Sequence, residues 1–500
     1  MSIGWIIFIV ATIGWHVGLY GMFKKAGIEG WKALVPFYNT WCMVTKMNLK
    51  KYWFFLQLIP IAGQFITIWI MIKFVEHFGR FGVGHHALTV FLPFIYFPYL
   101  GFSSNERYAG ELVVKNYKKT AAREWIDAAA FAVVAATLIR TFVFEAYTIP
   151  TPSEEKTLLV NDFLFVSKSA YGPRIPNTPI AMPFVHHTLP FFNTKAYVEW
   201  IHIPYTRWFA SPVVRNDAVV FNFPANDTLI NDAADNFGSK TTYYEAVRFW
   251  GRDAVWQKYG DSIITRPVDK RENFIKRCVA IAGDTLQIKE GIVHINGVPQ
   301  TLFPQSERMY RVVDTKNFYP NEDNLKEIGI NIREEQGDIR REDNGDVLVN
   351  ITNEEWSKLS PANAAKFATY IEPVSNRLFP FYNAASNWGA DNYGPLWIPK
   401  KGESIQLTAD NYIRYQRCIG AYEGNKIEMK GDKVFINDKE AAAYTFKMNY
   451  YWLMGDNRHN SLDSRYWGFV PEDHVVGKAS LIWFSWEKGP RWKRIFQSIK

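Results

Sequence analysis

The stretch IPTPS at residues 149–153 marks the point at which this chain changes its character. Long apolar segments come before it, and short runs rich in β-branched and aromatic residues come after it. Proline lacks a backbone N–H and restricts the residue before it, so Pro150 and Pro152 end any preceding helix and impose an extended segment. We therefore expect Ser153 to lie just beyond the end of an apolar helix.

Four apolar stretches lie upstream and predict an α-helical membrane region. They cover residues 3–23, 52–75, 87–102 and 125–147. The first two reach the roughly 20 residues that a helix needs to cross hydrocarbon. The third is short and contains Pro93 and Pro98, so a re-entrant or interfacial segment is an alternative there. The fourth carries charged residues near both ends, which is typical of an anchor helix whose charges reach the headgroups.

The net charge of +8 belongs mostly to two loops between apolar stretches. Residues 23–51 contain six lysines and one acidic residue, and residues 103–124 contain five basic and three acidic residues. Basic loops of this kind indicate the cytoplasmic side of a membrane protein rather than a nucleic-acid partner. If all four stretches span the membrane, both termini lie outside the cytoplasm.

Short β-type runs separated by turn residues follow Ser153 and predict a mainly β soluble domain. The runs cover residues 163–167, 218–223, 279–281, 293–295, 347–351, 434–436 and 481–484. Thr352 and Glu355 match a capping box and predict a helix start. The highly charged segment 305–352 has no site pattern, and we interpret it as a solvated insertion.

An internal repeat relates residues 277–297 to residues 417–438. Both copies begin with Arg-Cys followed by an apolar run and end in a Val-x-Ile-Asn sequence. Gln416 stands in the second copy where the first has Lys276. A lysine that merely suited the strand could have been kept in both copies, so the difference favours a special role for Lys276.

Serine is a poor nucleophile until a base removes its proton, and a lysine can be that base only while its amine is neutral. Taken alone, Ser153 is most often a turn serine and Lys276 a solvated strand lysine. Their positions, one at the end of an anchor helix and the other on a β-type run, make the pair a candidate nucleophile and base.

Four ordered blocks carry a family resemblance. They are residues 140–172 with the IPTPS stretch, residues 217–221, residues 274–284 with FIKR, and residues 455–471 with GDNRHNS. Together they resemble the bacterial type I signal peptidases, which are Ser/Lys peptidases. The first 120 residues and the long insertions lie outside the resemblance.

The resemblance implies that Ser153 attacks the scissile carbonyl while neutral Lys276 accepts its proton. The Thr151 hydroxyl and the Ser153 backbone N–H would hold the oxyanion. Ser461 would orient the lysine amine, and Asp463 would pair with Arg465 to brace the site.

The resemblance also implies shallow apolar pockets that accept small residues, as in the Ala-x-Ala pattern that ends signal peptides. Tyr147, Ile149, Phe274 and Ile275 would line these pockets. The implied function is removal of N-terminal signal peptides from exported preproteins by a membrane-bound serine endopeptidase. Its partners would be preproteins, the lipid bilayer and the export machinery, and we expect no nucleic acid, cofactor or metal ion.

The expected fold is a mainly β catalytic domain with a large insertion, tethered to an N-terminal helical membrane region. Residues 1–123 would hold up to three transmembrane or re-entrant segments, and residues 124–147 the anchor helix. The peptidase domain would comprise residues 148–299 and 450–490, and residues 300–449 would form an inserted α+β region with the repeated strand unit. We expect a multi-pass protein of the bacterial inner membrane with its catalytic domain on the outer, periplasmic face.

Two departures from the family pattern leave alternatives open. Glu154, Glu155 and Lys156 follow the serine where the family commonly has Met and then Pro, and an acidic group near the lysine works against a neutral amine. His459 replaces an acid, which raises Ser-His-Asp catalysis with Asp456 or Asp463 as an alternative. A non-catalytic module that binds signal peptides or export machinery is a second alternative. Whether Cys278 and Cys418 pair stays open.

Overall fold

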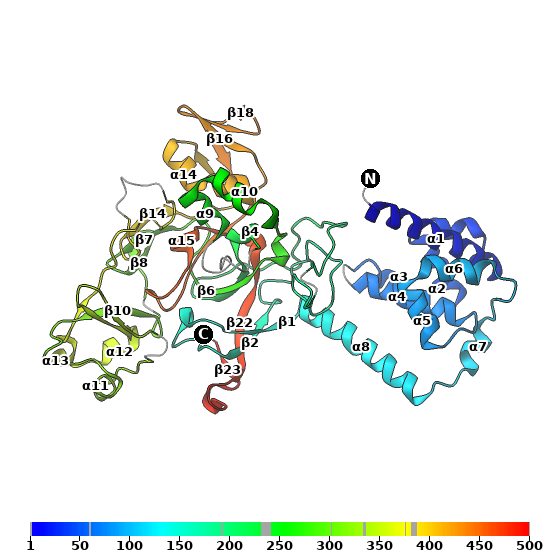
Figure 1. Cartoon of the computed structure of the whole chain (residues 1–500), viewed down its shortest axis with the longest axis horizontal. Coiled ribbons are helices and arrows are strands. Elements are labelled where there is room, and N and C mark those ends of the chain that lie inside the picture. Colours follow the sequence, from blue (N-terminus) through cyan, green and yellow to red (C-terminus); the bar gives the residue numbers. More distant parts are fainter. Residues whose placement is uncertain are drawn as a thin grey trace. The chain divides into compact units, whose positions relative to one another are not determined.

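The computed structural model describes residues 3–59, 62–191, 194–231, 242–301, 303–333, 337–375, 377–381 and 388–499. The chain divides into two compact units, one formed mainly by residues 1–139 and the other by most of residues 140–500. The first is helical, and the second contains the β-sheets in a mixed α and β fold (Figure 1).

The helical unit packs around a close contact between its first and sixth helices. Its elements are α1 (Ile3–Lys25), α2 (Tyr38–Lys46), α3 (Tyr52–Leu56), α4 (Ala62–Glu76), α5 (Val83–Phe91), α6 (Pro93–Phe102), α7 (Glu111–Asn116) and α8 (Ala121–Phe142), the last of which runs on into the second unit. Gly18 and Gly21 lie where α1 meets α6, and a Cβ on Gly21 would come within 2.9 Å of Gly101. Glycine at these positions lets the two backbones approach closely.

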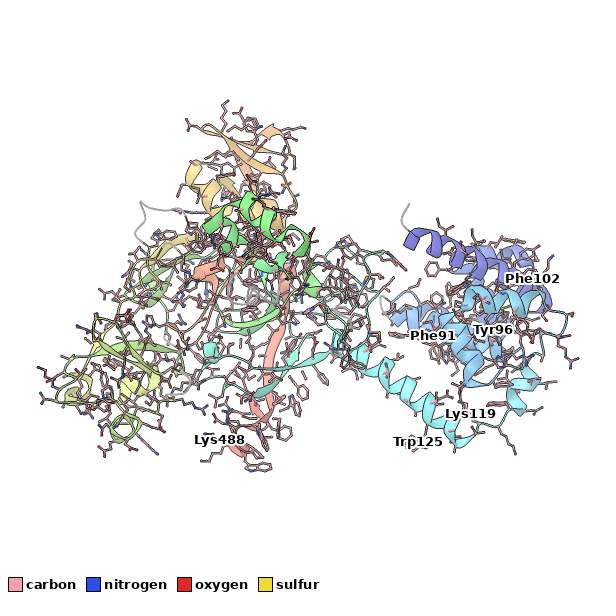
Figure 2. The ribbon with its side chains drawn as sticks, in the orientation of Figure 1. Phe91, Tyr96, Phe102, Lys119, Trp125 and Lys488 are labelled. Atoms are coloured by element: carbon pink, nitrogen blue, oxygen red, sulfur yellow. The ribbon has the colours of Figure 1, made fainter. Side chains whose placement is uncertain are left out.

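The expected multi-pass arrangement is not supported. Among the described residues, α8 is the one helix long and apolar enough to cross a membrane by length and composition. The stretch 87–102 is divided between α5 and α6 at Leu92, because Pro93 starts a new helix. None of the α8 side chains is buried, and Trp125 near its start is 78% exposed (Figure 2).

The second unit is built on an eight-stranded antiparallel sheet in the order β1-β2-β22-β3-β6-β20-β21, with β23 beside β22. The strands are β1 (Phe144–Thr148), β2 (Asp162–Ser167), β3 (Ala218–Asn222), β6 (Asn273–Ala280), β20 (Tyr450–Met454), β21 (Val470–Pro471), β22 (Val475–Ser485) and β23 (Gln497–Ser498). Strand β6 lies between β3 and β20, so sheet neighbours cover both edges of the strand that carries Lys276.

Smaller sheets surround this one (Figure 1). One contains β10 (Glu307–Val312), β11 (Ile339–Arg341), β12 (Val347–Thr352) and β13 (Phe367–Thr369), and another contains β7 (Thr285–Lys289), β8 (Ile292–Ile295), β9 (Val298–Pro299) and β14 (Tyr393–Trp397). The remaining strands form the sets β4 (Thr228–Ile230) with β5 (Ile263–Thr265), β15 (Ser404–Gln406) with β19 (Ala443–Thr445), and β16 (Ile427–Lys430) with β17 (Lys433–Ile436) and β18 (Lys439–Glu440).

Short helices join the strands of this unit. They are α9 (Tyr243–Trp250), α10 (Arg252–Tyr259), α11 (Glu322–Glu327), α12 (Asn353–Lys358), α13 (Pro361–Ala364), α14 (Ala409–Arg417) and α15 (Ser464–Trp467). The capping box that starts α12 is confirmed, because the Thr352 side chain accepts from the Glu355 N–H and the Glu355 carboxylate accepts from the Thr352 N–H. Each predicted β-type run lies in a strand, except that Ile281 and Phe223 fall just beyond strand ends.

The repeat of the base-bearing strand is not a strand in its second copy. Residues 277–280 are in β6, but Arg417 ends helix α14 and residues 418–422 form a π-helical turn. Thr408 caps this helix by accepting from the Asn411 N–H, a local start signal that β6 lacks. The hairpins that follow the two segments do correspond.

Cys278 and Cys418 are both free and buried. They therefore do not pair with each other in this structure. Each belongs to an apolar core, Cys278 to the core around β3, β6 and β20 and Cys418 to the core around β7, β8 and α14.

Candidate active site

The nucleophile turn follows β1 and is a single 3₁₀ turn from Pro152 to Glu154. Proline is common at the first position of such a turn. Its fixed φ angle suits the turn, and an N–H at this position would have no partner within the turn. The turn is held from the opposite side by Asn457, whose backbone N–H donates to the Ser153 carbonyl (3.1 Å) and whose side-chain amide donates to the Pro152 carbonyl (3.3 Å). Ser153 thus lies against the turn that follows β20.

The side chain of Lys276 reaches this turn from the middle of the large sheet. Its Nζ donates to Ser153 Oγ over 2.5 Å, although the two residues are 123 positions apart in the sequence. The lysine side chain is 4% exposed, whereas Ser153 is partly exposed. A buried amine in contact with an accessible hydroxyl is the arrangement that a general base and a nucleophile require.

Gly455 permits this close approach. A Cβ added there would lie 2.6 Å from the Ser153 carbonyl oxygen and would also collide with the Ser461 hydroxyl. Any side chain at this position would therefore push the nucleophile turn away from β20.

The Thr151 hydroxyl lies beside the nucleophile. Its Oγ1 is 3.5 Å from Ser153 Oγ, and Thr151 is exposed. A hydroxyl in this position can donate to an oxyanion that forms next to Ser153 Oγ.

Two buried ion pairs support the site. Arg277, next to Lys276, binds both carboxylate oxygens of Asp456, at 2.7 and 2.6 Å, and the Thr157 hydroxyl donates to the same carboxylate at 2.7 Å. Asp463 accepts from Arg465 Nε and Nη2 at 2.9 and 2.8 Å. These contacts tie the sheet, the nucleophile loop and the segment after β20 to one another.

The Asp463 pair is wholly buried. Burial by itself would raise the pKa of Asp463, but the Arg465 charge and the hydrogen bonds from the Gly455 and Arg465 backbone N–H groups lower it. Asp463 is therefore held as a carboxylate.

The expected hydrogen bond between Ser461 and the lysine amine is absent. Ser461 Oγ is buried and has no hydrogen-bond partner among the described residues. It packs against Gly455 instead. Within the described part of the chain, the polar groups that contact Lys276 Nζ are Ser153 Oγ and Glu154 Oε1.

The alternative with His459 as base is not supported. Its Nδ1 accepts from the Met309 backbone N–H (2.9 Å), and its Nε2 lies 2.8 Å from Asp391 Oδ2. Both ring nitrogens are engaged in these contacts, and the side chain is fully buried. His459 therefore joins the insertion to the segment after β20 and does not reach Ser153.

The structure brings together three of the four residues expected to line substrate pockets. Ile275 packs in one apolar cluster with Ile149 and in a second one with Tyr147. Phe274 packs in a different core, against Phe223 with a ring-centroid separation of 4.4 Å. Successive strand residues point to opposite faces of a sheet, so Phe274 cannot share the face of Ile275.

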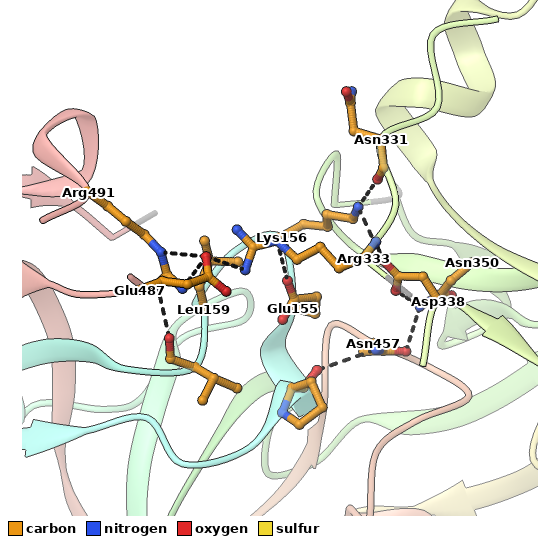
Figure 3. Close-up of polar contacts among 12 residues, drawn as sticks. Glu155, Lys156, Leu159, Asn331, Arg333, Asp338, Asn350, Asn457, Glu487 and Arg491 are labelled. Carbon is orange, nitrogen blue, oxygen red and sulfur yellow. Dashed lines mark hydrogen bonds and ion pairs between the residues drawn. The ribbon is translucent and has the colours of Figure 1, made fainter. Parts of the chain in front are cut away.

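Sequence reasoning missed the part that the insertion plays at this site. The Glu307 backbone N–H donates to the Asp456 carbonyl (2.8 Å), and the Arg458 N–H donates to the Glu307 carbonyl (2.9 Å). The Asn350 amide donates to Asn457 Oδ1 (3.1 Å) and to Asp338 Oδ1 (3.4 Å) (Figure 3). The segment interpreted as a solvated insertion thus supports the turn that holds Ser153, and no motif in it signalled this.

Sequence reasoning also left open where the acidic residues after the nucleophile point. Glu154 and Glu155 are both buried, and Glu154 Oε1 lies 3.4 Å from Lys276 Nζ. Burial, and to a smaller extent the nearby Asp456 carboxylate, raise the pKa of Glu154 to about 8, although the Lys276 and Arg277 charges oppose the rise. The departure from the family pattern is therefore in direct contact with the candidate base.

Comparisons with known proteins match two families along the chain. Residues 122–341 and 443–486, more than half of the chain, match the family described as "Signal peptidase, peptidase S26". Residues 31–111 match a family of unknown function, DUF5684. The signal peptidase I of Buchnera aphidicola subsp. Schizaphis graminum is 25% identical over 356 residues, covering 70% of this chain and 71% of that protein. The signal peptidase I of Haemophilus influenzae is 24% identical over 375 residues, or 73% of this chain and 72% of that protein.

Proposed function

Because this chain belongs to the peptidase S26 family of signal peptidases, we propose that it is a membrane-bound serine endopeptidase that removes N-terminal signal peptides from exported preproteins. Ser153 is the nucleophile, and neutral Lys276 is the general base. The observation that carries this proposal is the 2.5 Å separation of Lys276 Nζ from Ser153 Oγ.

In the acylation step, Ser153 Oγ attacks the scissile carbonyl as its proton passes to Lys276 Nζ. The Thr151 hydroxyl and the Ser153 backbone N–H stabilise the oxyanion of the tetrahedral intermediate. The resulting ammonium donates a proton to the leaving amine, and the signal peptide remains on Ser153 as an ester. A water molecule then attacks the ester with Lys276 again as base, which releases the signal peptide and restores the serine.

Asp463 and Arg465 brace the site. Their ion pair and the hydrogen bond from the Gly455 N–H to Asp463 hold the segment that lies against Ser153. Ser461 supports the same segment by packing against Gly455.

The apolar side chains near Ser153 favour small substrate residues before the cleaved bond, as in the Ala-x-Ala pattern. Tyr147, Ile149 and Ile275 form adjoining apolar clusters, which supports their role as pocket-lining residues. Phe274 lies two positions before Lys276 and therefore on the same face of β6 as the candidate base, opposite to the face of Ile275.

The enzyme works at a membrane surface because the apolar part of a signal peptide lies in the bilayer. Helix α8 ends at Phe142, and the nucleophile turn begins ten residues later, which supports α8 as the anchor that places Ser153 near the headgroups. The bacterial cytoplasmic membrane, with the catalytic domain on its outer face, is the proposed location. Preproteins, lipid and the export machinery are the proposed partners.

The proposed function assigns a role to each region of the chain. Residues 1–123 form a helical region before the anchor, which was expected to run as a helix to residue 147. The anchor helix ends at Phe142 instead, because residues 144–148 form strand β1. The peptidase domain comprises residues 148–299 and 450–490, and residues 300–449 form the inserted region, whose first strand, β10, contacts the segment after β20.

The experiment is a cleavage assay on an exported preprotein with the full-length protein in detergent or vesicles. Ser153→Ala and Lys276→Ala should each abolish cleavage while the protein still folds and inserts, because nucleophile and base act as a unit. Cleavage that persists in both variants would reject the Ser/Lys assignment. A wild-type protein that binds the preprotein without cutting it would reject the enzyme in favour of a binding module.

A further inference from the structure

The side chain of Glu154 points into the protein beside the candidate base. It directly follows Ser153 in the 3₁₀ turn, so the turn that presents the serine outward also directs the next side chain inward. Its side chain is 1% exposed, and its Oε1 lies 3.4 Å from Lys276 Nζ. The second oxygen, Oε2, is buried and has no hydrogen-bond partner among the described residues.

Three charged groups face this carboxyl group: Lys276 and Arg277 from β6, and Asp456 from the turn after β20. Arg277 is already bound through two nitrogens to Asp456, so its charge is largely balanced there. Lys276 has no other carboxylate within ion-pair distance among the described residues. Glu154 and Lys276 are therefore each other's nearest opposite charge.

Glu155 is a natural comparison because it is equally buried but faces elsewhere. Its carboxylate lies 3.6 Å from Arg333, on the inserted region, and has no contact with Lys276 (Figure 3). Burial raises the pKa of Glu155 to about 7, with Arg333 and Lys156 opposing and Asp338 reinforcing that shift. The two neighbouring glutamates thus share an environment of low polarity but differ in their partner.

We propose that Glu154 is a positioning residue for Lys276: its carboxyl group accepts a hydrogen bond from Nζ and sets the protonation state of the amine, and with it the pH range in which Ser153 is activated. This inference deepens the proposed Ser/Lys mechanism and rests on it. It assigns to Glu154 the orienting contact that was expected from Ser461.

The physical consequence has two parts. A carboxylate next to Nζ stabilises the ammonium that forms when Lys276 accepts the Ser153 proton, as the aspartate does for the base in a Ser-His-Asp triad. The same carboxylate also attracts the ammonium before the reaction. Because burial raises the pKa of Glu154 to about 8, this attraction is fully present only above that pH.

No proton is lost or gained by Glu154 during the step itself. The Ser153 proton moves to Nζ as the bond between Oγ and the carbonyl carbon forms. A Glu154 side chain that is already ionised, above its raised pKa of about 8, keeps its charge while it accepts from the ammonium. The proton then passes from Nζ to the leaving amine. Glu154 therefore acts through Lys276 and does not touch the substrate.

The test is the pH dependence of kcat/KM for full-length wild type, Glu154→Gln, Glu154→Met and Glu155→Gln on one peptide substrate. The acid limb of both Glu154 variants should move to lower pH by about 1 to 2 units, because the neighbouring negative charge is gone. Their plateau kcat should fall by about 10-fold, the effect of losing one hydrogen bond to a charged group. Glu155→Gln is the matched control and should keep the wild-type midpoint.

Glu154→Asp is a conservative variant that keeps the carboxyl group. The midpoint of its acid limb should lie closer to that of wild type than to that of Glu154→Gln. Thermal unfolding of each variant identifies any that fail to fold, and either Glu154→Gln or Glu154→Met is sufficient for the comparison. Overlapping acid limbs for wild type and the folded Glu154 variants would overturn the inference. An equal shift in Glu155→Gln would also overturn it, because the effect would then belong to any buried charge nearby. Activity in Lys276→Ala under the same conditions would instead reject the proposed Ser/Lys function itself.

Discussion

Two segments with the same sequence pattern fold differently at their start and alike at their end. Residues 277–280 belong to strand β6 in the large sheet, whereas residues 417–422 are helical. Both are followed by a hairpin, β7–β8 in the first case and β16–β17 in the second, with Leu286 opposite Ile295 and Ile427 opposite Ile436. The difference distinguishes secondary structure that a short sequence determines by itself from secondary structure that depends on tertiary contacts.

The hairpins agree because their signals are local. After each hairpin a two-residue turn leads into one more strand, and its φ angles are positive at both positions: 53° and 83° at Asn296 and Gly297, and 51° and 64° at Asn437 and Asp438. Such turns favour Asn, Asp and Gly. In both copies the asparagine side chain accepts a backbone N–H at the start of the hairpin, from Thr285 in one case and Lys426 in the other.

The starts differ because β6 has sheet neighbours and α14 has a cap. Strand β6 pairs with β3 over residues 273–277 and with β20 over residues 277–280. Helix α14 begins at the Thr408 cap, and Tyr415, Cys418 and Ile419 bury its apolar side. Only the first segment therefore brings the residue before Arg-Cys to the nucleophile.

The strongest test of this comparison exchanges the two residues before Arg-Cys. Lys276→Gln should lower kcat/KM by at least about 10³-fold, because it removes one member of a unit of nucleophile and base. Gln416→Lys should leave cleavage unchanged and should not rescue Lys276→Gln in the double variant, because position 416 lies on a helix. Cleavage kinetics on one preprotein check all three. Restored activity in the double variant would contradict the positional argument.

The second test compares the two arginines. Arg277→Met should destabilise the protein by about 3 to 5 kcal/mol, because it leaves the buried Asp456 carboxylate without its partner. Arg417→Met should cost less, about 1 to 2 kcal/mol, because its ion pair with Asp227 at 3.0 Å is partly exposed, although its guanidinium also donates to the Tyr422 hydroxyl and the Pro224 carbonyl. Denaturant unfolding in detergent measures both. Equal losses of unfolding free energy in the two variants would contradict a larger contribution of Arg277 than of Arg417 to stability.

The third test compares two threonines: Thr151, which lies beside Ser153, and Thr408, which caps helix α14. Thr151→Val should lower kcat by about 10²- to 10³-fold with little change in KM, because it removes an oxyanion donor. Thr151→Ser keeps the hydroxyl and should retain activity near the wild-type level.

Thr408→Val is the matched control for the loss of a threonine hydroxyl. It removes the cap of α14 and should lower the free energy of unfolding by about 1 kcal/mol without changing kcat. A kinetic loss in Thr408→Val as large as that in Thr151→Val would contradict an oxyanion role for Thr151.

Much of the β part could be predicted from sequence, and less of the membrane part. The β-type runs are strands and the box at Thr352 caps a helix, because alternation and capping operate within a few residues. The stretch 87–102 was predicted as one short transmembrane or re-entrant segment because it contains Pro93 and Pro98. The structure divides it into two helices, the second of which starts at Pro93.

The sequence predicted which residues belong to the candidate site, but it did not predict all of the contacts between them. Ser153 and Lys276 were singled out by position and motif, and they do meet. The Ser461 contact was wrong, because the hydroxyl packs on Gly455. Phe274 was grouped with Ile275, although neighbouring strand residues face opposite ways.

The sequence by itself determined the strands, the capped helices and the turn at Pro152, and it singled out Ser153 and Lys276 as the candidate nucleophile and base. These depend on residue type, on spacing and on backbone restrictions that act over a few positions. Only the tertiary structure decided that Glu154 faces Lys276 while Glu155 faces Arg333, and that the insertion holds the turn behind Ser153. Such contacts join segments more than a hundred residues apart, and their direction follows from how the sheet and the insertion pack.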